Sequence, residues 1–162
     1  MYRAIATTLL LVFCMLAEAK QPASTAQALV IPTGHGVVYV YRPRQFTNAL
    51  IKPGIVVDGR EYPMLPTGKF LKFVLPEGDH LFDLKMSDTY HGSAAGRLRV
   101  LSGEIYYVRL DTSIEDIDYK TSQRLFSFDP VATTEAVPQI AKCKAIDLEK
   151  GKFYKKSSFS DN

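Results

Sequence analysis

The chain has 162 residues, of which 46% are hydrophobic, and it carries a formal net charge of +3 at pH 7. This length suits one domain with a proper core, and a mildly basic charge without a basic stripe gives no reason to expect a nucleic-acid partner. The chain has two cysteines, and Cys14 lies in the leader that is predicted below to be removed, so Cys143 alone can form neither a disulfide framework nor a cysteine-based zinc site within one chain.

Residues 1–19 have the three zones of a secretory signal peptide. A positively charged start precedes an uncharged run from Ala4 to Leu16, and Ala-Glu-Ala at 17–19 matches a cleavage site, so we expect a cut between Ala19 and Lys20. The run is shorter than the ~20 residues of a membrane-spanning helix. Cys14 lies inside it, too early for lipid attachment. The sequence predicts an exported protein, periplasmic or secreted, with no transmembrane or lipid anchor.

Short strands dominate the predicted domain. Residues 20–33 are rich in small and polar types, which favours a flexible N-terminal segment. From residue 34 to residue 128, apolar and polar side chains alternate and turn residues intervene. The clearest strand is Val37–Arg42, and Asp58-Gly59 predicts a hairpin turn. We expect a mainly β fold, an antiparallel β-sandwich of about seven or eight strands.

The C-terminal part changes character. Asp129-Pro130 suggests a helix start, Pro138 interrupts that helix, and a second short helix is expected from Gln139 to about Leu148. We therefore expect a helical appendage at 129–150. Residues 151–162 are rich in Lys and Ser, and we expect a disordered basic tail there.

Four sequence segments resemble known bacterial domains. VVYVYRP at 37–43, followed by VVDG at 56–59, resembles the opening of a domain of unknown function found in exported proteins and lipoproteins. LPEGDH at 75–80 is similar to the turn that gives the PEGA domains their name, and GEIYYV at 103–108 fits a later strand of these domains. The resemblance covers roughly residues 34–128. It implies a β-sandwich in the cell envelope and offers no catalytic residues to carry over.

The sequence contains no pattern typical of catalysis or of a bound cofactor. His35, His80 and His91 form neither an H-E-x-x-H nor an H-x-H arrangement. Asp79-His80 and Asp88 with His91 could approach each other across a hairpin and bind a metal. Ordinary turn and surface histidines explain these residues more simply. We expect no catalytic residue, no metal site and no cofactor.

Two smaller features also have simple interpretations. Cys143 is left alone once Cys14 leaves with the signal peptide, and we expect a packed free thiol, with a link between two copies as the open alternative. Glu115, Asp116 and Asp118 form the densest acidic cluster, which we interpret as a solvated link before the last strand rather than as a calcium site.

The best functional candidate is a patch of aromatic and basic residues: Tyr39, Tyr41, Arg42, Arg44 and Phe46. Such side chains supply contact area together with polar tips. The alternative is that the two tyrosines fill the core while the arginines face water.

Three functional hypotheses follow. The first is a non-enzymatic binding or interaction module of the bacterial periplasm or cell envelope, with another envelope protein or a glycan as partner. The second is a carbohydrate- or peptidoglycan-binding domain, which would expose Tyr39, Tyr41 or Phe46 on a concave face. The third is a small metal-assisted enzyme, which would bring His80 and His91 together with carboxylates. The sequence leaves the oligomeric state open.

Overall fold

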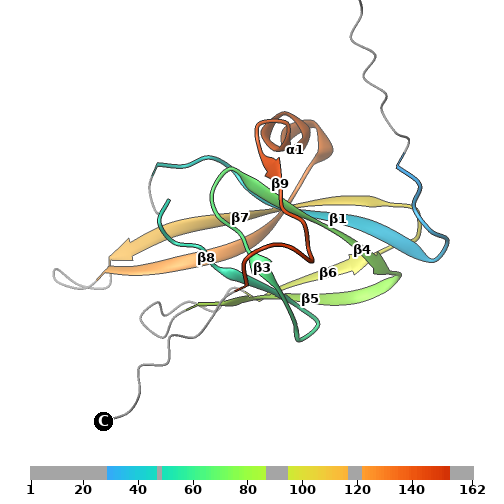
Figure 1. Cartoon of the computed structure of the whole chain (residues 1–162), viewed down its shortest axis with the longest axis horizontal. Coiled ribbons are helices and arrows are strands. Elements are labelled where there is room, and N and C mark those ends of the chain that lie inside the picture. The colour runs from blue at the N-terminus through green and yellow to red at the C-terminus, as the bar shows by residue number, and fades with distance from the viewer. Residues whose placement is uncertain (1–28, 47–48, 87–94, 117–121, 154–162) are drawn as a thin grey trace, which may run out of the picture.

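The computed structural model describes residues 29–46, 49–86, 95–116 and 122–153. The predicted leader, its cleavage site at Ala19–Lys20 and residues 154–162 of the predicted tail lie outside these ranges. The fold is mainly β, with two sheets and one short helix, α1 (Thr133–Ile140), as Figure 1 shows.

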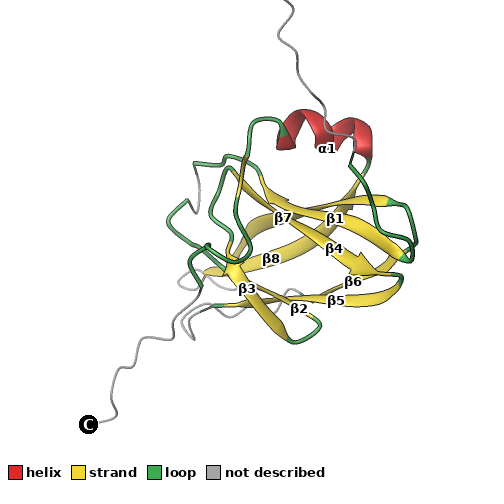
Figure 2. Ribbon diagram, turned by 45° about the vertical axis from the view of Figure 1, so that its right-hand side comes forward, coloured by secondary structure: helices red, strands yellow, loops and turns green. Residues whose placement is uncertain are grey.

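Sheet A contains five strands in the spatial order β8 (Ser122–Val131), β7 (Ile105–Asp116), β1 (His35–Arg42), β4 (Lys69–Pro76) and β9 (Lys144–Ala145). Sheet B contains four strands in the order β3 (Arg60–Met64), β2 (Gly54–Val57), β5 (Gly78–Lys85) and β6 (Gly96–Val100). Figure 2 shows α1 over sheet A, on the side away from sheet B.

The expectation of purely antiparallel sheets is wrong for sheet A. Strand β1 runs parallel to β7, and β4 runs parallel to β9, whereas every pair in sheet B is antiparallel. The chain reaches β7 only after it has passed through sheet B, so β7 joins β1 by a long crossover rather than a hairpin. The described ranges hold nine strands, more than the seven or eight expected, and β9 lies where a helix was predicted.

Inward-facing side chains of both sheets form a single core, as the alternating pattern predicts. Val38 and Val40 of β1, together with Leu71 and Phe73 of β4, are at most 1% exposed. The Phe73 ring packs edge-on against the Tyr62 ring of β3, with ring centroids 4.9 Å apart. This aromatic contact joins the two sheets.

The predicted Asp58-Gly59 turn is confirmed and connects β2 to β3. Both residues have positive φ, 50° at Asp58 and 78° at Gly59. Such a pair fits the tight turn of a hairpin, because glycine tolerates this backbone at no steric cost.

Strands β6 and β8 approach each other closely at one side of the core. A Cβ atom at Gly96 would lie only 2.7 Å from the Cβ atom of Phe128. Only glycine allows this approach, because any side chain at position 96 would clash with Phe128. The edge strand β6 of sheet B therefore packs closely against the edge strand β8 of sheet A.

The region after the last predicted strand differs from expectation. Asp129 and Pro130 belong to β8, so the helix begins later, at Thr133, and Pro138 lies inside it. The second helix is absent from the described chain, because the backbone there pairs with β4: Ile146 N–H donates to Phe70 O. The predicted acidic link is also partly strand, since β7 extends through Glu115 and Asp116, while Asp118 lies outside the described ranges.

The start of the predicted disordered tail packs against sheet B. Lys152 O accepts a hydrogen bond of 2.8 Å from Met64 N–H at the end of β3. A Cβ atom at Gly151 would lie 2.5 Å from two side-chain atoms of Pro63. The expectation of disorder is therefore wrong for residues 151–153.

Candidate functional site

The side of sheet A that faces away from sheet B carries the candidate site. The register places three rows of side chains across β7, β1 and β4 on this side. From one end to the other the rows are Ile105, Val37 and Val74; Tyr107, Tyr39 and Lys72; and Arg109, Tyr41 and Phe70. These residues come from strands far apart in the sequence, so only the fold brings them together.

Three aromatic rings form a cluster on this side. The Tyr39 ring stacks on the Tyr107 ring with centroids 5.4 Å apart and planes 14° apart. The Phe70 ring lies on the other side of Tyr39, tilted, with centroids 5.8 Å apart. All three rings are partly exposed. Burial raises the pKa of the Tyr39 hydroxyl, and the neighbouring Tyr107 adds to that rise.

Helix α1 lies over Tyr41 and Arg109 of the third row, and a network of polar side chains holds it there. Tyr41 Oη donates a hydrogen bond of 3.1 Å to Gln139 Oε1. Arg109 forms ion pairs with Glu135 at 2.5 Å and with Asp111 at 2.6 Å. Burial lowers the pKa of the Arg109 guanidinium, but the hydrogen bonds and charges of the two carboxylates outweigh burial and raise it. The helix is thereby held over Tyr41, which is fully buried.

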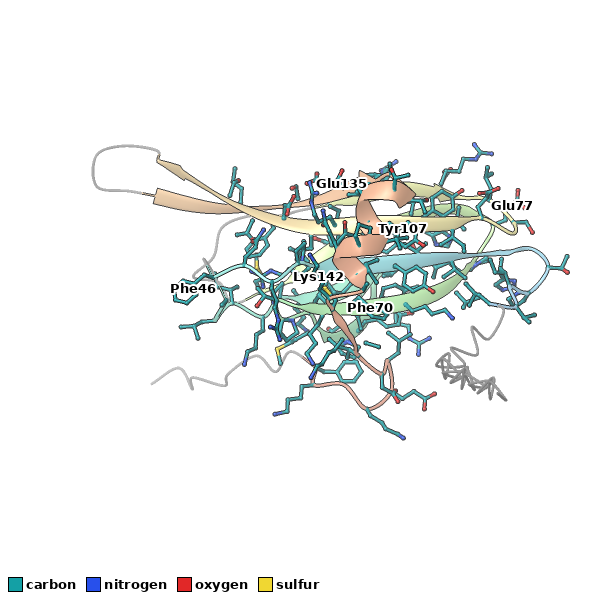
Figure 3. The ribbon with its side chains drawn as sticks, turned by 90° about the horizontal axis from the view of Figure 1, so that it is seen from above. Phe46, Phe70, Glu77, Tyr107, Glu135 and Lys142 are labelled. Atoms are coloured by element: carbon teal, nitrogen blue, oxygen red, sulfur yellow. The ribbon has the colours of Figure 1, made fainter. Side chains whose placement is uncertain are left out.

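The side chains of this side that are neither buried nor bonded to the helix leave a surface that we call the open outer face. It consists of Phe70 from the third row and all of the first two rows except the fully buried Val37, that is, Tyr39, Lys72, Val74, Ile105 and Tyr107. Val74 is 46% exposed and Ile105 is 39% exposed. Figure 3 shows Tyr107 and Phe70 beside the helix.

The structure separates the five residues of the predicted patch. Tyr39 is partly exposed on the open outer face, but Tyr41 on the same side is buried beneath α1. Arg42 points to the opposite side and is fully buried, which corrects the expectation that it faces water. Arg44 and Phe46 are exposed in the loop after β1. The patch is therefore not one continuous surface.

Arg42 acts in the interior of the protein. Its Nη1 donates to Ile51 O at 2.6 Å, its Nη2 donates to Thr112 Oγ1 at 3.4 Å, and its guanidinium lies 5.8 Å from the Phe126 ring centroid. Burial lowers the pKa of this guanidinium. Arg42 thus joins the loop after β1 to β7 and β8.

The sequence interpretation missed most of the open outer face. Phe70, Lys72 and Val74 alternate with the core residues of β4, and Ile105 and Tyr107 belong to β7. Strand β7 is internal, between β8 and β1. The signal available was Tyr107 next to Val108, since a tyrosine with a polar tip is unusual in a strand buried on both faces.

Among the described histidines, His80 has both ring nitrogens engaged. Nδ1 lies 2.6 Å from Asp58 Oδ2, and Nε2 lies 2.8 Å from Pro76 O. Burial lowers the pKa of His80, but the bonds to Asp58 and Pro76 and the charges of Asp58 and Asp79 outweigh it and raise the pKa. Because an ionised carboxylate and a carbonyl both accept hydrogen bonds, this arrangement favours the imidazolium.

The metal-assisted hypothesis gains no support from these positions. His91 lies outside the described ranges. Within the ranges that are described, no group of three or more His, Cys, Asp or Glu side chains could hold a metal ion.

Cys143 is a free thiol in the described part of the chain. It follows α1, and its Sγ lies 3.4 Å from Gln139 O and 3.8 Å from Arg42 O. Burial raises the pKa of this thiol, and the charge of Arg44 opposes the rise. A raised pKa disfavours the reactive thiolate at neutral pH.

Comparison with family models found no match, and comparisons with curated proteins and with solved structures found none either. The resemblance to PEGA-type domains stays a prediction. Across the described residues, no helix has the length and apolar character needed to cross a membrane.

Proposed function

We propose that the chain is a non-enzymatic β-sandwich module of the bacterial cell envelope that binds another envelope protein through its open outer face. The single observation that carries this proposal is the partly exposed stack of Tyr39 on Tyr107, bordered by the exposed aliphatic residues Val74 and Ile105. Export rests on the three zones of residues 1–19 and their cleavage pattern at Ala19–Lys20.

The chemistry of the surface favours a protein partner. The buried centres of protein interfaces are enriched in tyrosine and phenylalanine and poor in charge. The open outer face contains three aromatic residues, two aliphatic residues and one cation, Lys72. An apolar patch of this kind on one face of a sheet is the usual mark of a contact site.

A glycan is the second candidate, because the stacked tyrosines offer a platform for a sugar ring. Glycan recognition also requires several polar groups directed at the hydroxyls. On this side of sheet A, the charged and amide groups Arg109, Asp111, Glu135 and Gln139 bond to one another or to Tyr41. The part that remains open is mostly apolar, so the protein partner is preferred.

The test is affinity capture from the envelope of the source organism with three forms of the protein. The first is the parent and the second is the double variant Val74→Ser/Ile105→Ser, which makes the open outer face polar. The third is Val56→Ser/Leu81→Ser, which removes matched side chains from the outer side of sheet B. We expect one protein to be captured by the parent and the sheet B variant but lost from the open-face variant.

Two results would reject the proposal. In one, all three forms capture the same proteins. In the other, the parent binds isolated peptidoglycan and the Val74→Ser/Ile105→Ser variant loses that binding, which would establish the glycan-binding alternative.

A further inference from the structure

The loop between β1 and β2 carries two apolar side chains fully in water. Phe46 is 102% exposed and Leu50 is 93% exposed. Both lie in the described parts of the loop, outside the core and away from the open outer face. A phenylalanine and a leucine side chain in water are unfavourable. Transfer of both side chains into an apolar phase is favourable, because it removes their apolar surface from water.

Four exposed cations lie in this loop and in a second segment that the fold brings next to its start. The loop contributes Arg44 and Lys52, and the segment after α1 contributes Lys142 and Lys144. Neither residues 43–52 nor residues 139–146 include an aspartate or a glutamate. The charge of these two segments is therefore entirely positive, in a chain whose net charge is only +3.

The fold places the two segments against each other. Lys144 N–H donates to Gly68 O at 3.0 Å, and Gly68 N–H donates to Arg42 O at 2.8 Å. A Cβ atom at Gly68 would lie 2.8 Å from Arg44 Cγ, so the Arg44 side chain runs directly over this turn. Cys143 Sγ lies 3.8 Å from Arg42 O. In Figure 3, Phe46 lies at the end of the molecule opposite Glu77, with Lys142 between Phe46 and Tyr107.

We propose that this end of the molecule is a peripheral contact site for an anionic lipid surface. We call it the cationic tip, defined by Arg44, Phe46, Leu50, Lys52, Lys142 and Lys144. Phe46 and Leu50 enter the boundary between headgroups and acyl chains, and the four cations pair with lipid phosphates. Each cation close to an anionic membrane adds to the attraction.

A lipid surface explains the combination better than other anionic partners do. An anionic polysaccharide would use the cations and leave Phe46 and Leu50 in water. A protein partner of the kind proposed for the open outer face would use a broad flat surface, whereas Phe46 and Leu50 are fully exposed in a loop. The cationic tip shares no residue with the open outer face, although β9 places Lys144 next to Lys69, the neighbour of Phe70. Separate variants therefore test the two sites.

The test is co-sedimentation with vesicles of phosphatidylcholine, alone or mixed with phosphatidylglycerol. The protein is expressed as the full chain and purified in the form that the cell accumulates, with its first residue defined by mass spectrometry. We expect binding to the mixed vesicles, little binding to phosphatidylcholine alone, and a loss of binding as salt screens the charges.

Two double variants test the two components of the tip. Phe46→Ser/Leu50→Ser removes the apolar pair, and Lys142→Glu/Lys144→Glu reverses two cations. Each is expected to weaken binding by about tenfold or more. The matched controls are Val56→Ser/Leu81→Ser for the apolar change and Arg97→Glu/Arg99→Glu on β6 for the charge change, and both should bind like the parent.

The proposal is overturned if the parent does not sediment with mixed vesicles, or if Arg97→Glu/Arg99→Glu weakens binding as much as Lys142→Glu/Lys144→Glu. It is also overturned if the apolar variant binds like the parent while the lysine variant does not, because charge alone would then be recognised, as in binding to an anionic glycan. The Val74→Ser/Ile105→Ser variant should still bind vesicles, which separates this site from the protein contact.

Discussion

The two sides of sheet A are made by the same strands but differ in composition and in what covers them. On the inner side, Val38, Val40, Leu71 and Phe73 pack against sheet B and are almost completely buried. The outer side mixes aromatic, charged and aliphatic side chains, and α1 bonds to Tyr41 and Arg109 of its third row. One side supplies the apolar burial that stabilises the fold, whereas the other retains a surface that water still reaches.

This difference separates two kinds of tyrosine on one strand. Tyr39 and Tyr41 lie two residues apart on the same side of β1, yet Tyr41 is buried beneath α1 and Tyr39 is partly exposed. The position of one eight-residue helix decides which residue is structural and which is available to a partner. The predictions below test this division.

The largest effect is expected on the inner side. Phe73→Ala removes a ring that is 1% exposed and packs on Tyr62, so it should lower the free energy of unfolding by about 3–5 kcal/mol. Phe46→Ala, the same change at a fully exposed position, should alter that free energy by less than about 0.5 kcal/mol. Urea unfolding measures both. Equal losses would show that the assignment of core and surface is wrong.

The next largest effect concerns the helix that covers the third row. Ala136 is the buried residue of α1, so Ala136→Leu should overpack this contact and destabilise the protein by about 1–3 kcal/mol. Hydrogen exchange of the α1 amides should accelerate more than that of β1. Val137→Leu, at a neighbouring exposed position, is the control. Unchanged exchange in Ala136→Leu would mean that α1 does not dock tightly on sheet A.

A smaller, pH-dependent effect is expected where Asp58 and His80 join two turns. The pKa of His80 is raised in the folded protein. Its contribution to the free energy of unfolding is therefore fully present below the ordinary pKa of 6.5 and is lost as the pH rises through the pKa of the folded protein. Burial raises the pKa of Asp58, but the hydrogen bonds from His80 and Leu81 and the charge of His80 outweigh burial and lower this pKa. The contribution of Asp58 to the free energy of unfolding is therefore lost as the pH falls through the lowered pKa.

His80→Gln is expected to cost about 1–2 kcal/mol at mildly acidic pH, with a smaller difference from the parent at alkaline pH. Thermal unfolding across the pH range measures this difference. Asp58→Asn keeps an oxygen for Leu81 N–H but removes the charge, and it should flatten the same part of the profile. A parent stability that does not fall as the pH rises through the folded pKa of His80 would exclude an imidazolium at this position.

The smallest effect on stability is expected on the open outer face. Val74→Ser/Ile105→Ser should lower the free energy of unfolding by no more than about 1 kcal/mol per residue, because both side chains are exposed, at 46% and 39%, and lie outside the core. Its effect should appear in partner capture instead. A loss of several kcal/mol would assign these residues to packing rather than to binding.

Local patterns in the sequence were enough to predict most strands. Alternation at 71–75 and at 97–100 identified which side chains face inward, and Asp58-Gly59 identified a hairpin. Such signals depend on neighbouring residues, which share one local geometry. They contain no information on which distant strand becomes a neighbour, so the parallel pairing of β1 with β7 was not predicted.

The candidate site was predicted only in part for the same reason. Tyr39 was identified, but its partners Tyr107 and Phe70 come from β7 and β4. Arg42 was assigned to the surface because arginine is usually exposed, whereas here Ile51 O and Thr112 Oγ1 accept its hydrogen bonds in the interior. Residues 144–146 were assigned to a helix because nothing local reveals that β4 has an open edge to pair with.

The most direct test of the central claim is photo-crosslinking in living cells of the source organism. A photoreactive amino acid replaces Val74 on the open outer face in one variant and Leu81 on the outer side of sheet B in another. If the open outer face is the contact surface, position 74 should give a discrete crosslinked envelope protein that position 81 does not give. Identical adducts from both positions, or none from position 74, would contradict the account.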